Sequence, residues 1–211
     1  MLNGARTVKL DRGLDAFERH DWKQARRLLE EANKESSRAI GCYHLGLLYW
    51  RGLGGPPNKA GAANLFARAA ADGYPRAQTA YGIALRSGIG VAKDLELARQ
   101  QFRFAAGAGD GEAMVQIAFL SDPEEGLRWL SRASEMGYAP AMAHLADRLM
   151  EHDPVDALSW LCASVAISGD DVARKRAAAL AQEMTAAEIE EAQKIGKRFT
   201  KDLQTRADGP R

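Results

Sequence analysis

The sequence repeats itself at an interval of 36 residues, and this period constrains the fold more than any other feature. A shift by that interval superposes residues of one type: Gly46 on Gly82, Gly52 on Gly88, Gly54 on Gly90, Phe66 on Phe102 and Gly73 on Gly109. Self-similarity at such a period is typical of repeat proteins. Each unit of these proteins leaves an apolar face that only its neighbour covers, so we expect the units to form one continuous stack.

The pattern within one period predicts two antiparallel helices. The first helix carries a small residue at its centre, Gly46 or Gly82, where the missing side chain lets the paired helix approach closely. The second helix presents Phe66 or Phe102, followed by alanines, as an apolar stripe at a spacing of three to four residues. Each unit is therefore predicted to be a helical hairpin.

Residues 87–94 read SGIGVAKD, and a glycine pair of this kind could cradle a phosphate. A dinucleotide fingerprint needs a preceding strand and a third glycine, whereas this pair follows a helical segment and has a counterpart in the unit before. The segment therefore favours a corner between helices. We expect Gly88 to end one helix in a left-handed conformation, Gly90 to allow the turn and Asp94 to cap the next helix.

Two consecutive segments resemble the Sel1-like repeat family, whose members are tetratricopeptide-like α-solenoids. The segment CYHLGLLYWRGLGG and the segment AQTAYGIALRSGIGVAKD carry the family's motif residues: Leu45, Gly46, Tyr49, Gly52 and Gly54 in the first, and Ala77, Gly82, Gly88, Gly90, Val91 and Asp94 in the second. Upstream, GLDAFERHDWKQARRLLEEA looks more like a tetratricopeptide unit.

Downstream of these units the loops shorten, and no Gly-x-Gly pair occurs. Helix starts are still readable, because Asp122-Pro123 and Asp153-Pro154 each combine an N-cap with a proline at the first helical position. Thr185-x-x-Glu188 has the form of a capping box that begins the last helix.

We therefore expect an all-α fold, a right-handed α-solenoid of about five to six antiparallel helix pairs. The expected single domain covers residues 1–203, and residues 204–211 are expected to form a flexible tail. The expected units are approximately residues 5–36, 39–73, 75–109, 111–137, 139–169 and 171–200.

Charge and composition limit the kinds of partner. The chain has 29 Lys and Arg against 28 Asp and Glu, a formal charge of +1, so no overall field attracts nucleic acid or an anionic membrane. Neither a signal peptide nor an apolar stretch long enough to cross a bilayer is visible, which favours a cytoplasmic protein.

Cys42 and Cys162 lie in apolar helical patterns and are read as reduced core residues, with a disulfide or a reactive thiol as the alternative.

The sequence shows no recognisable catalytic or metal-binding motif. The four histidines, His20, His44, His144 and His152, are scattered and do not show the spacing of a zinc site. No nucleophile elbow, phosphate-binding loop or kinase signature occurs. The sequence thus predicts no metal, no cofactor and no catalytic residue.

The resemblance implies recognition of a protein or peptide in a concave groove lined by first helices. Placed on a tetratricopeptide-like frame, the residues expected to line this groove are Leu14, Phe17, Tyr43, Leu47, Trp50, Arg51, Thr79, Ile83, Arg86, Asp147 and Glu151. Aromatic residues and arginines commonly anchor interfaces. The competing interpretation is that Leu14, Phe17, Leu47 and Trp50 pack between repeats.

Two basic segments stand near the C-terminal end, ARKRAAA at residues 173–179 and GKRFTK at residues 196–201. One interpretation is the solvated face of a terminal helix pair. The other is a docking site for an acidic partner.

The resemblance to the Sel1-like repeat family implies a noncatalytic interaction module, and we expect a bacterial adaptor or regulator in signalling that binds a peptide or a partner helix. One alternative is a hydrolase-like enzyme that acts on cell-wall or antibiotic substrates through a pocket of unfamiliar groups. Another alternative is a structural scaffold that self-associates. A monomer is expected, with self-association left open.

Overall fold

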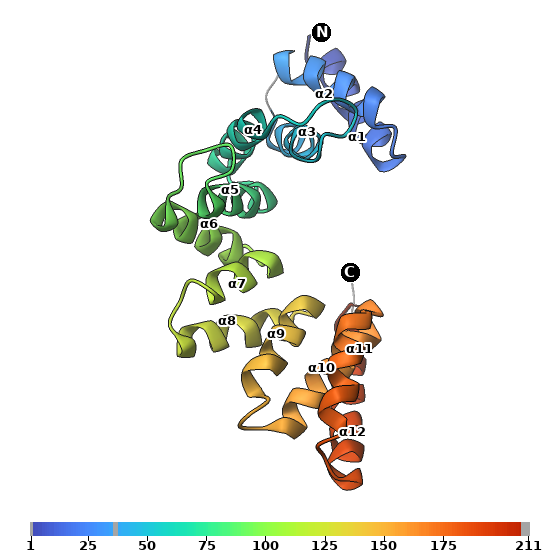
Figure 1. Cartoon of the computed structure of the whole chain (residues 1–211). Helices are drawn as coiled ribbons and strands as arrows, with labels where there is room; N and C mark the ends of the chain where they lie inside the picture. The colour runs from blue at the N-terminus through green and yellow to red at the C-terminus, as the bar shows by residue number, and fades with distance from the viewer. Residues whose placement is uncertain (1, 36–37, 208–211) are drawn as a thin grey trace. The chain divides into compact units, whose positions relative to one another are not determined.

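The structure is a computed structural model that describes residues 2–35 and 38–207, with the backbone alone for residues 2–7 and 207. Within these residues the chain forms twelve helices and no strand, so the predicted all-α fold is confirmed (Figure 1). The helices are α1 (Leu2–Glu18), α2 (Trp22–Glu35), α3 (Ala39–Arg51), α4 (Lys59–Ala71), α5 (Pro75–Ser87), α6 (Leu95–Gly107), α7 (Gly111–Ala118), α8 (Pro123–Glu135), α9 (Ala139–Leu149), α10 (Pro154–Ser168), α11 (Asp171–Ala181) and α12 (Ala186–Ala207).

The chain divides into two compact units, residues 1–113 and residues 114–211, and α7 spans the boundary. Each unit has its own packing and is described by itself. The expectation of one continuous domain over residues 1–203 stays a prediction.

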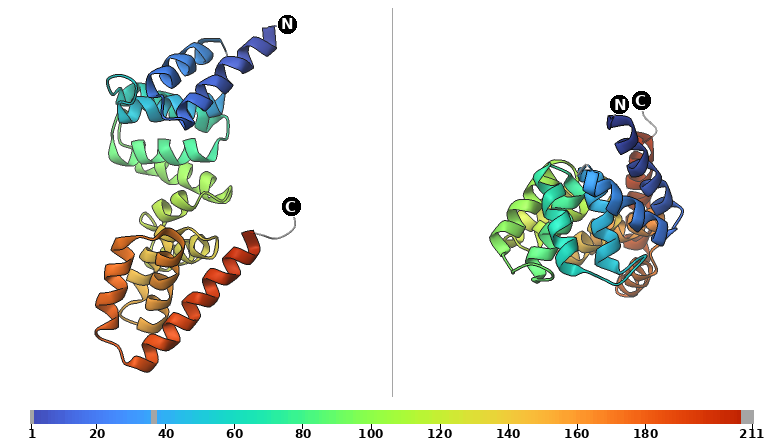
Figure 2. Two further views of the ribbon diagram at one scale, coloured as in Figure 1. Left: turned by 90° about the vertical axis from the view of Figure 1, so that its right-hand side faces the viewer. Right: turned by 90° about the horizontal axis from the view of Figure 1, so that it is seen from above.

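Unit 1 consists of three helical hairpins, α1–α2, α3–α4 and α5–α6, whose two helices pack against each other (Figure 2). Helix α3 also packs against α1 and α5, so the first helices of the three hairpins form one layer. The second helices α2 and α4 join each hairpin to the next by packing against α3 and α5. The predicted hairpin unit is therefore present three times in succession.

The central glycines of α3 and α5 allow their hairpins to close. A Cβ atom at Gly46 would lie 2.5 Å from the ring of Phe66, and one at Gly82 would lie 2.6 Å from the ring of Phe102. Both rings are fully buried, at 2% and 0% exposure, so they have no room to move away. The close helix approach predicted from these glycines is thus confirmed.

The Gly-x-Gly corners lie in the loops that connect the two helices of a hairpin, α3 to α4 and α5 to α6. Gly88 ends α5 with a φ of 70°, as predicted, and Gly90 follows with a φ of 76°. A Cβ atom at Gly90 would lie 2.2 Å from the carbonyl oxygen of Lys59, the first residue of α4. A Cβ atom at Gly54 would likewise lie 2.2 Å from the carbonyl oxygen of Trp22, at the start of α2. Each corner therefore lies on the backbone of the preceding hairpin.

Side-chain caps begin the helices where the sequence predicts them. The carboxylate of Asp94 accepts a hydrogen bond from the Leu97 amide at 2.9 Å, and Asp122 and Asp153 cap α8 and α10 in the same way. In the capping box before α12, Glu188 accepts from the Thr185 amide at 2.8 Å, while the Glu188 amide donates to the Thr185 hydroxyl at 3.3 Å.

Unit 2 is organised around α10, which packs against α9, α11 and α12. Helix α12 crosses α10 closely at Gly196, where a Cβ atom would lie 2.8 Å from the carbonyl oxygen of Ser159. Beside this crossing the rings of Trp160 and Phe199 stack with their centroids 4.3 Å apart.

The last two helices therefore pack on α10 and make little contact with each other. This arrangement corrects the expected terminal pair within residues 171–200. Helix α12 also continues to Ala207, so residues 204–207 of the expected flexible tail are helical, and residues 208–211 lie outside the described residues.

Among the residues that the structure describes, no helix combines the length and the apolar character required to span a bilayer.

Candidate functional site

Aromatic side chains gather on the layer of first helices in unit 1. The ring of Phe17 on α1 meets the imidazole of His44 on α3 edge to face, with centroids 4.9 Å apart. Tyr43 meets His44 at 5.2 Å and Tyr74, at the start of α5, at 5.3 Å. The cluster thus connects all three first helices, and its members Phe17, Tyr43, His44 and Tyr74 are each partly exposed.

Trp50 extends the aromatic surface toward the C-terminal end of α3. Its ring lies 6.0 Å from that of Phe66, which anchors it to the core. The ammonium group of Lys59 lies 4.3 Å from the Trp50 ring centre and donates a hydrogen bond to the Trp50 carbonyl at 2.5 Å. Trp50 is partly exposed, so its ring both packs and remains reachable from solvent.

The structure places most of the predicted groove residues of unit 1 on this layer. Leu14, Leu47, Ile83 and Arg86 are partly exposed on α1, α3 and α5, and Arg51 is exposed at the end of α3. We call the surface formed by Leu14, Phe17, Tyr43, His44, Leu47, Trp50, Arg51, Tyr74, Ile83 and Arg86 the first-helix face.

Thr79 is different from the other predicted residues. Its side chain is only 2% exposed, and its hydroxyl donates a hydrogen bond to the Pro75 carbonyl one turn earlier in α5, at 3.2 Å. A side chain packed in this way cannot contact a partner, so Thr79 is left out of the first-helix face.

The predicted acidic residues Asp147 and Glu151 belong to unit 2, where both are exposed. The carboxylate of Asp147 accepts hydrogen bonds from the Arg176 guanidinium at 3.0 and 3.2 Å, and His144 lies 3.8 Å away. The ion pair with Arg176 offsets the charge of Asp147, which makes this part of the surface less acidic than the sequence suggests.

Burial alters the protonation of the aromatic cluster. Partial burial, aided by the charge of Arg76, lowers the pKa of His44 below its ordinary value. The Nδ1 atom of His44 lies 2.8 Å from the Ile40 carbonyl, so in the neutral ring Nδ1 carries the proton and donates it. Burial raises the pKa of Tyr43. Both side chains are therefore uncharged at neutral pH and offer a polar but neutral surface.

Sequence reasoning missed two members of this face, His44 and Tyr74. In the sequence His44 was considered only as a metal ligand, whereas in the structure the rings of Phe17 and Tyr43 pack against it. Tyr74 had a signal in the sequence, since Gly-Tyr recurs before a first helix at residues 73–74 and 137–138.

The described residues hold no group of three or more His, Cys, Asp or Glu side chains that could bind a metal ion. Cys42 is buried, as predicted, and its thiol donates to the Asn33 side chain at 3.2 Å. Cys162 is only partly buried, which differs from the core position expected for it.

Helical hairpins that recur every 36 residues, with glycine corners that contact the preceding hairpin, define a helical-repeat protein of the tetratricopeptide-like class. The family model of the Sel1 repeat matches residues 39–74, 75–110 and 119–138. The chain therefore carries three Sel1 repeats, and the resemblance seen in the sequence is confirmed.

Solved structures show the same fold. A protective antigen of uropathogenic Escherichia coli that displays an SLR fold is 23% identical with a TM-score of 0.72; the match covers 97% of this chain and 46% of that one, so this chain spans less than half of it. A Sel1 repeat protein from Oxalobacter formigenes is 22% identical with a TM-score of 0.72, covering 93% and 87% of the two chains.

A third structure, an immunity protein from Pseudomonas aeruginosa, is 19% identical with a TM-score of 0.53, covering 86% of this chain and 74% of that one. No curated protein gives a significant match to the chain.

Proposed function

We propose that this protein is a noncatalytic interaction module, a cytoplasmic adaptor or regulator that binds a peptide or a partner helix on the first-helix face. Sel1 repeat proteins generally mediate protein–protein interaction. The observation that carries the proposal is the cluster of partly exposed aromatic rings across α1, α3 and α5.

The residue types of this face suit recognition. Tyrosine, tryptophan and arginine supply most of the binding energy at many interfaces, and Tyr43, Trp50 and Arg51 lie together on α3. Ring contacts already fix the orientation of Tyr43 and Trp50, so little side-chain entropy is lost when a partner binds.

The charges on the face favour one kind of segment. Arg51 and Arg86 lie at the C-terminal ends of α3 and α5, in the last turn of each helix. A segment with apolar anchors for the aromatic cluster and a carboxylate near these arginines would therefore match the face.

The test is affinity purification from the source cell, followed by mass spectrometry, with the wild type and with Tyr43→Ala/Trp50→Ala. We expect the double variant to lose a specific partner that the wild type retains. Phe104→Ala is the matched control, because Phe104 is 55% exposed on the second helix α6, away from the first-helix face.

Circular dichroism should show that the double variant is folded, so that a lost partner reflects the surface and not unfolding. Equal recovery with the wild type and the double variant would remove Tyr43 and Trp50 from the binding site. No specific observation on the described residues favours the hydrolase-like or the scaffold alternative.

A further inference from the structure

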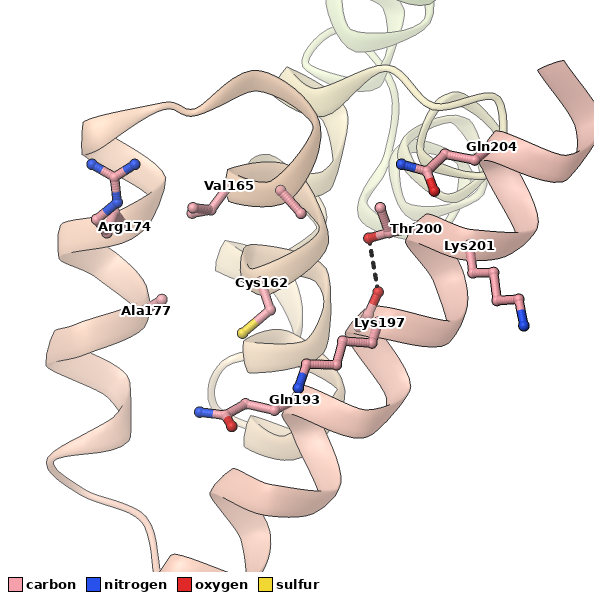
Figure 3. Close-up of a pocket in the computed structure, with 11 residues that line it drawn as sticks. Cys162, Val165, Arg174, Ala177, Gln193, Lys197, Thr200, Lys201 and Gln204 are labelled. Atoms are coloured by element: carbon pink, nitrogen blue, oxygen red, sulfur yellow. Dashed lines mark hydrogen bonds between the residues drawn. The ribbon is translucent and has the colours of Figure 1, made fainter. Parts of the chain in front are cut away.

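The two basic segments near the C-terminal end lie on opposite walls of one groove. Helix α11 forms one wall and α12 the other, while α10 forms the floor (Figure 3). Arg174 comes from the first basic segment, and Lys197 and Lys201 come from the second. The groove lies entirely within unit 2 and has a volume of about 490 Å³.

The groove exists because the last two helices do not close on each other. In the hairpins α1–α2, α3–α4, α5–α6 and α9–α10 the two helices pack directly, whereas α11 and α12 each pack on α10. Small side chains at Ala166, Ala177 and Gly196 leave the space between them unfilled. The result is an apolar channel flanked by two helices, which is the shape that a third helix fills.

Most of the lining is apolar, and its charges have one sign. Cys162 and Val165 point from α10 into the space between the walls. Of the charged side chains that line the groove, Arg174, Lys197 and Lys201, all are basic. Arg174 is paired with Asp171 of its own helix, while Lys197 and Lys201 form no ion pair with any side chain that the structure describes. An occupant with an apolar face and carboxylates beside it would offset the lysine charges.

We propose that this groove, defined by Cys162, Val165, Ala177, Gly196, Lys197 and Lys201, binds an acidic amphipathic helix of a partner protein. The lining residues of α12 run from Gln193 to Gln204, about three turns or roughly 16 Å. A helix of that length offers apolar residues at i, i+4 and i+7 to the floor, with glutamates along its flank toward α12. This site is separate from the first-helix face and does not depend on the function proposed for it.

The chain provides a built-in reporter of occupancy. Cys162 lines the groove and is partly exposed, whereas Cys42 is 1% exposed and hydrogen-bonded in unit 1. In a Cys42→Ala background, maleimide labelling therefore measures access to the groove. Burial raises the pKa of Cys162 while Lys197 opposes this effect, so labelling is followed at mildly alkaline pH.

The probe is a synthetic 15-residue helical peptide with leucines at i, i+4, i+7 and i+11 and glutamates on both flanks. We expect this peptide to slow labelling of Cys162, and a peptide with lysines in place of the glutamates to leave labelling unchanged. Lys197→Glu should weaken binding of the acidic peptide by about tenfold and allow the basic peptide to bind. Lys194→Glu is the matched control, because Lys194 is exposed on α12 but lies outside the groove.

Three results would overturn the proposal: unchanged labelling of Cys162 at peptide concentrations up to about 1 mM, equal protection by the acidic and basic peptides, or protection by dodecanoate but not by the peptide. The last result would mark the groove as a site for a small amphiphile. Tyr43→Ala/Trp50→Ala should leave protection of Cys162 intact, so failure of this proposal and failure of the proposed function are separable.

Discussion

At the scale of single residues, the glycines carry the most structural information, and they do so in two different ways. Gly82 makes room for the ring of Phe102 within its own hairpin, while Gly90 makes room for a backbone carbonyl of the preceding hairpin. The first role follows from helix packing and could be read from the sequence. The second depends on a contact between units, which a single hairpin does not reveal.

Gly82→Leu should destabilise the protein by about 1–3 kcal/mol or more, because the new side chain overpacks the contact with Phe102. The measurement is the free energy of unfolding in urea. The control is Gly107→Leu on α6, where an added Cβ meets nothing within 4 Å; there we expect a change below about 0.5 kcal/mol. Equal losses in both variants would refute the packing explanation.

Gly90→Ala should cost more stability than Gly73→Ala. Both residues have a positive φ, 76° and 77°, so both variants carry a strain of about 1–2 kcal/mol. Only at Gly90 would the new Cβ also lie 2.2 Å from a backbone oxygen, whereas at Gly73 nothing lies within 4 Å. The difference between the two unfolding free energies isolates the contact between hairpins, and no difference would show that the corner can move away.

Protonation of His44 should destabilise the protein in acid. The pKa of His44 is lowered in the folded state, so the unfolded state binds the proton more readily. Stability is then fully present above the unfolded pKa of about 6.5 and falls as the pH drops below it. Burial also lowers the pKa of His144, so protonation of His144 should likewise destabilise the protein in acid.

His44→Gln should therefore flatten the dependence of the unfolding free energy on pH between about 7.5 and 5.5, and His44→Gln/His144→Gln should flatten it further. His152→Gln, which replaces an exposed imidazole, is the control. An unchanged slope in the double variant would contradict this account.

At the scale of helices, the sequence predicts where a helix begins better than it predicts which other helix it packs against. Asp94, Asp122 and Asp153 cap their helices as expected, because a cap is a contact with an amide two or three residues away. The packing of α12 on α10 was not predicted, since it depends on long-range contacts at Gly196 and Phe199.

In the candidate site, too, the sequence predicts local features and misses those that depend on long-range contacts. Repeat register placed Tyr43, Leu47 and Trp50 on a first helix, and all three are partly exposed there. The same register placed Thr79 on the surface, although its side chain is only 2% exposed and donates a hydrogen bond to the Pro75 carbonyl of its own helix. The ion pair of Asp147 with Arg176 joins residues 29 positions apart and gave no local signal.

Asp94→Ala should lower stability by about 1 kcal/mol, because it leaves the Leu97 amide without its side-chain acceptor at the start of α6. Asp72→Ala is the control, since Asp72 follows the C-terminal end of α4, where a carboxylate caps no amide. Thermal unfolding followed by circular dichroism measures both variants. Similar melting temperatures for the two variants would argue against the cap.

At the scale of the whole molecule, the chain forms two compact units, each with its own buried core. In repeat proteins, stability is close to a sum of terms for each unit and for each pair of neighbours. A change in one hairpin should therefore act most strongly on that hairpin and on those beside it.

Gly46→Leu places a side chain against Phe66 in unit 1, where even a Cβ would lie 2.5 Å from the ring. Hydrogen exchange measured by mass spectrometry should show lost protection in α3 and α4, with a smaller loss in α9 and α10. Equal losses in all four helices would show that the chain unfolds as one cooperative block, as expected for a single domain.

The corners at Gly54 and Gly90 touch main-chain carbonyls, not particular side chains. Every helical hairpin offers such a carbonyl at the start of its second helix, whatever its sequence. The glycine corner itself therefore places no demand on the side chains of the neighbouring hairpin, and this contact stays the same when a 36-residue segment is copied, deleted or exchanged.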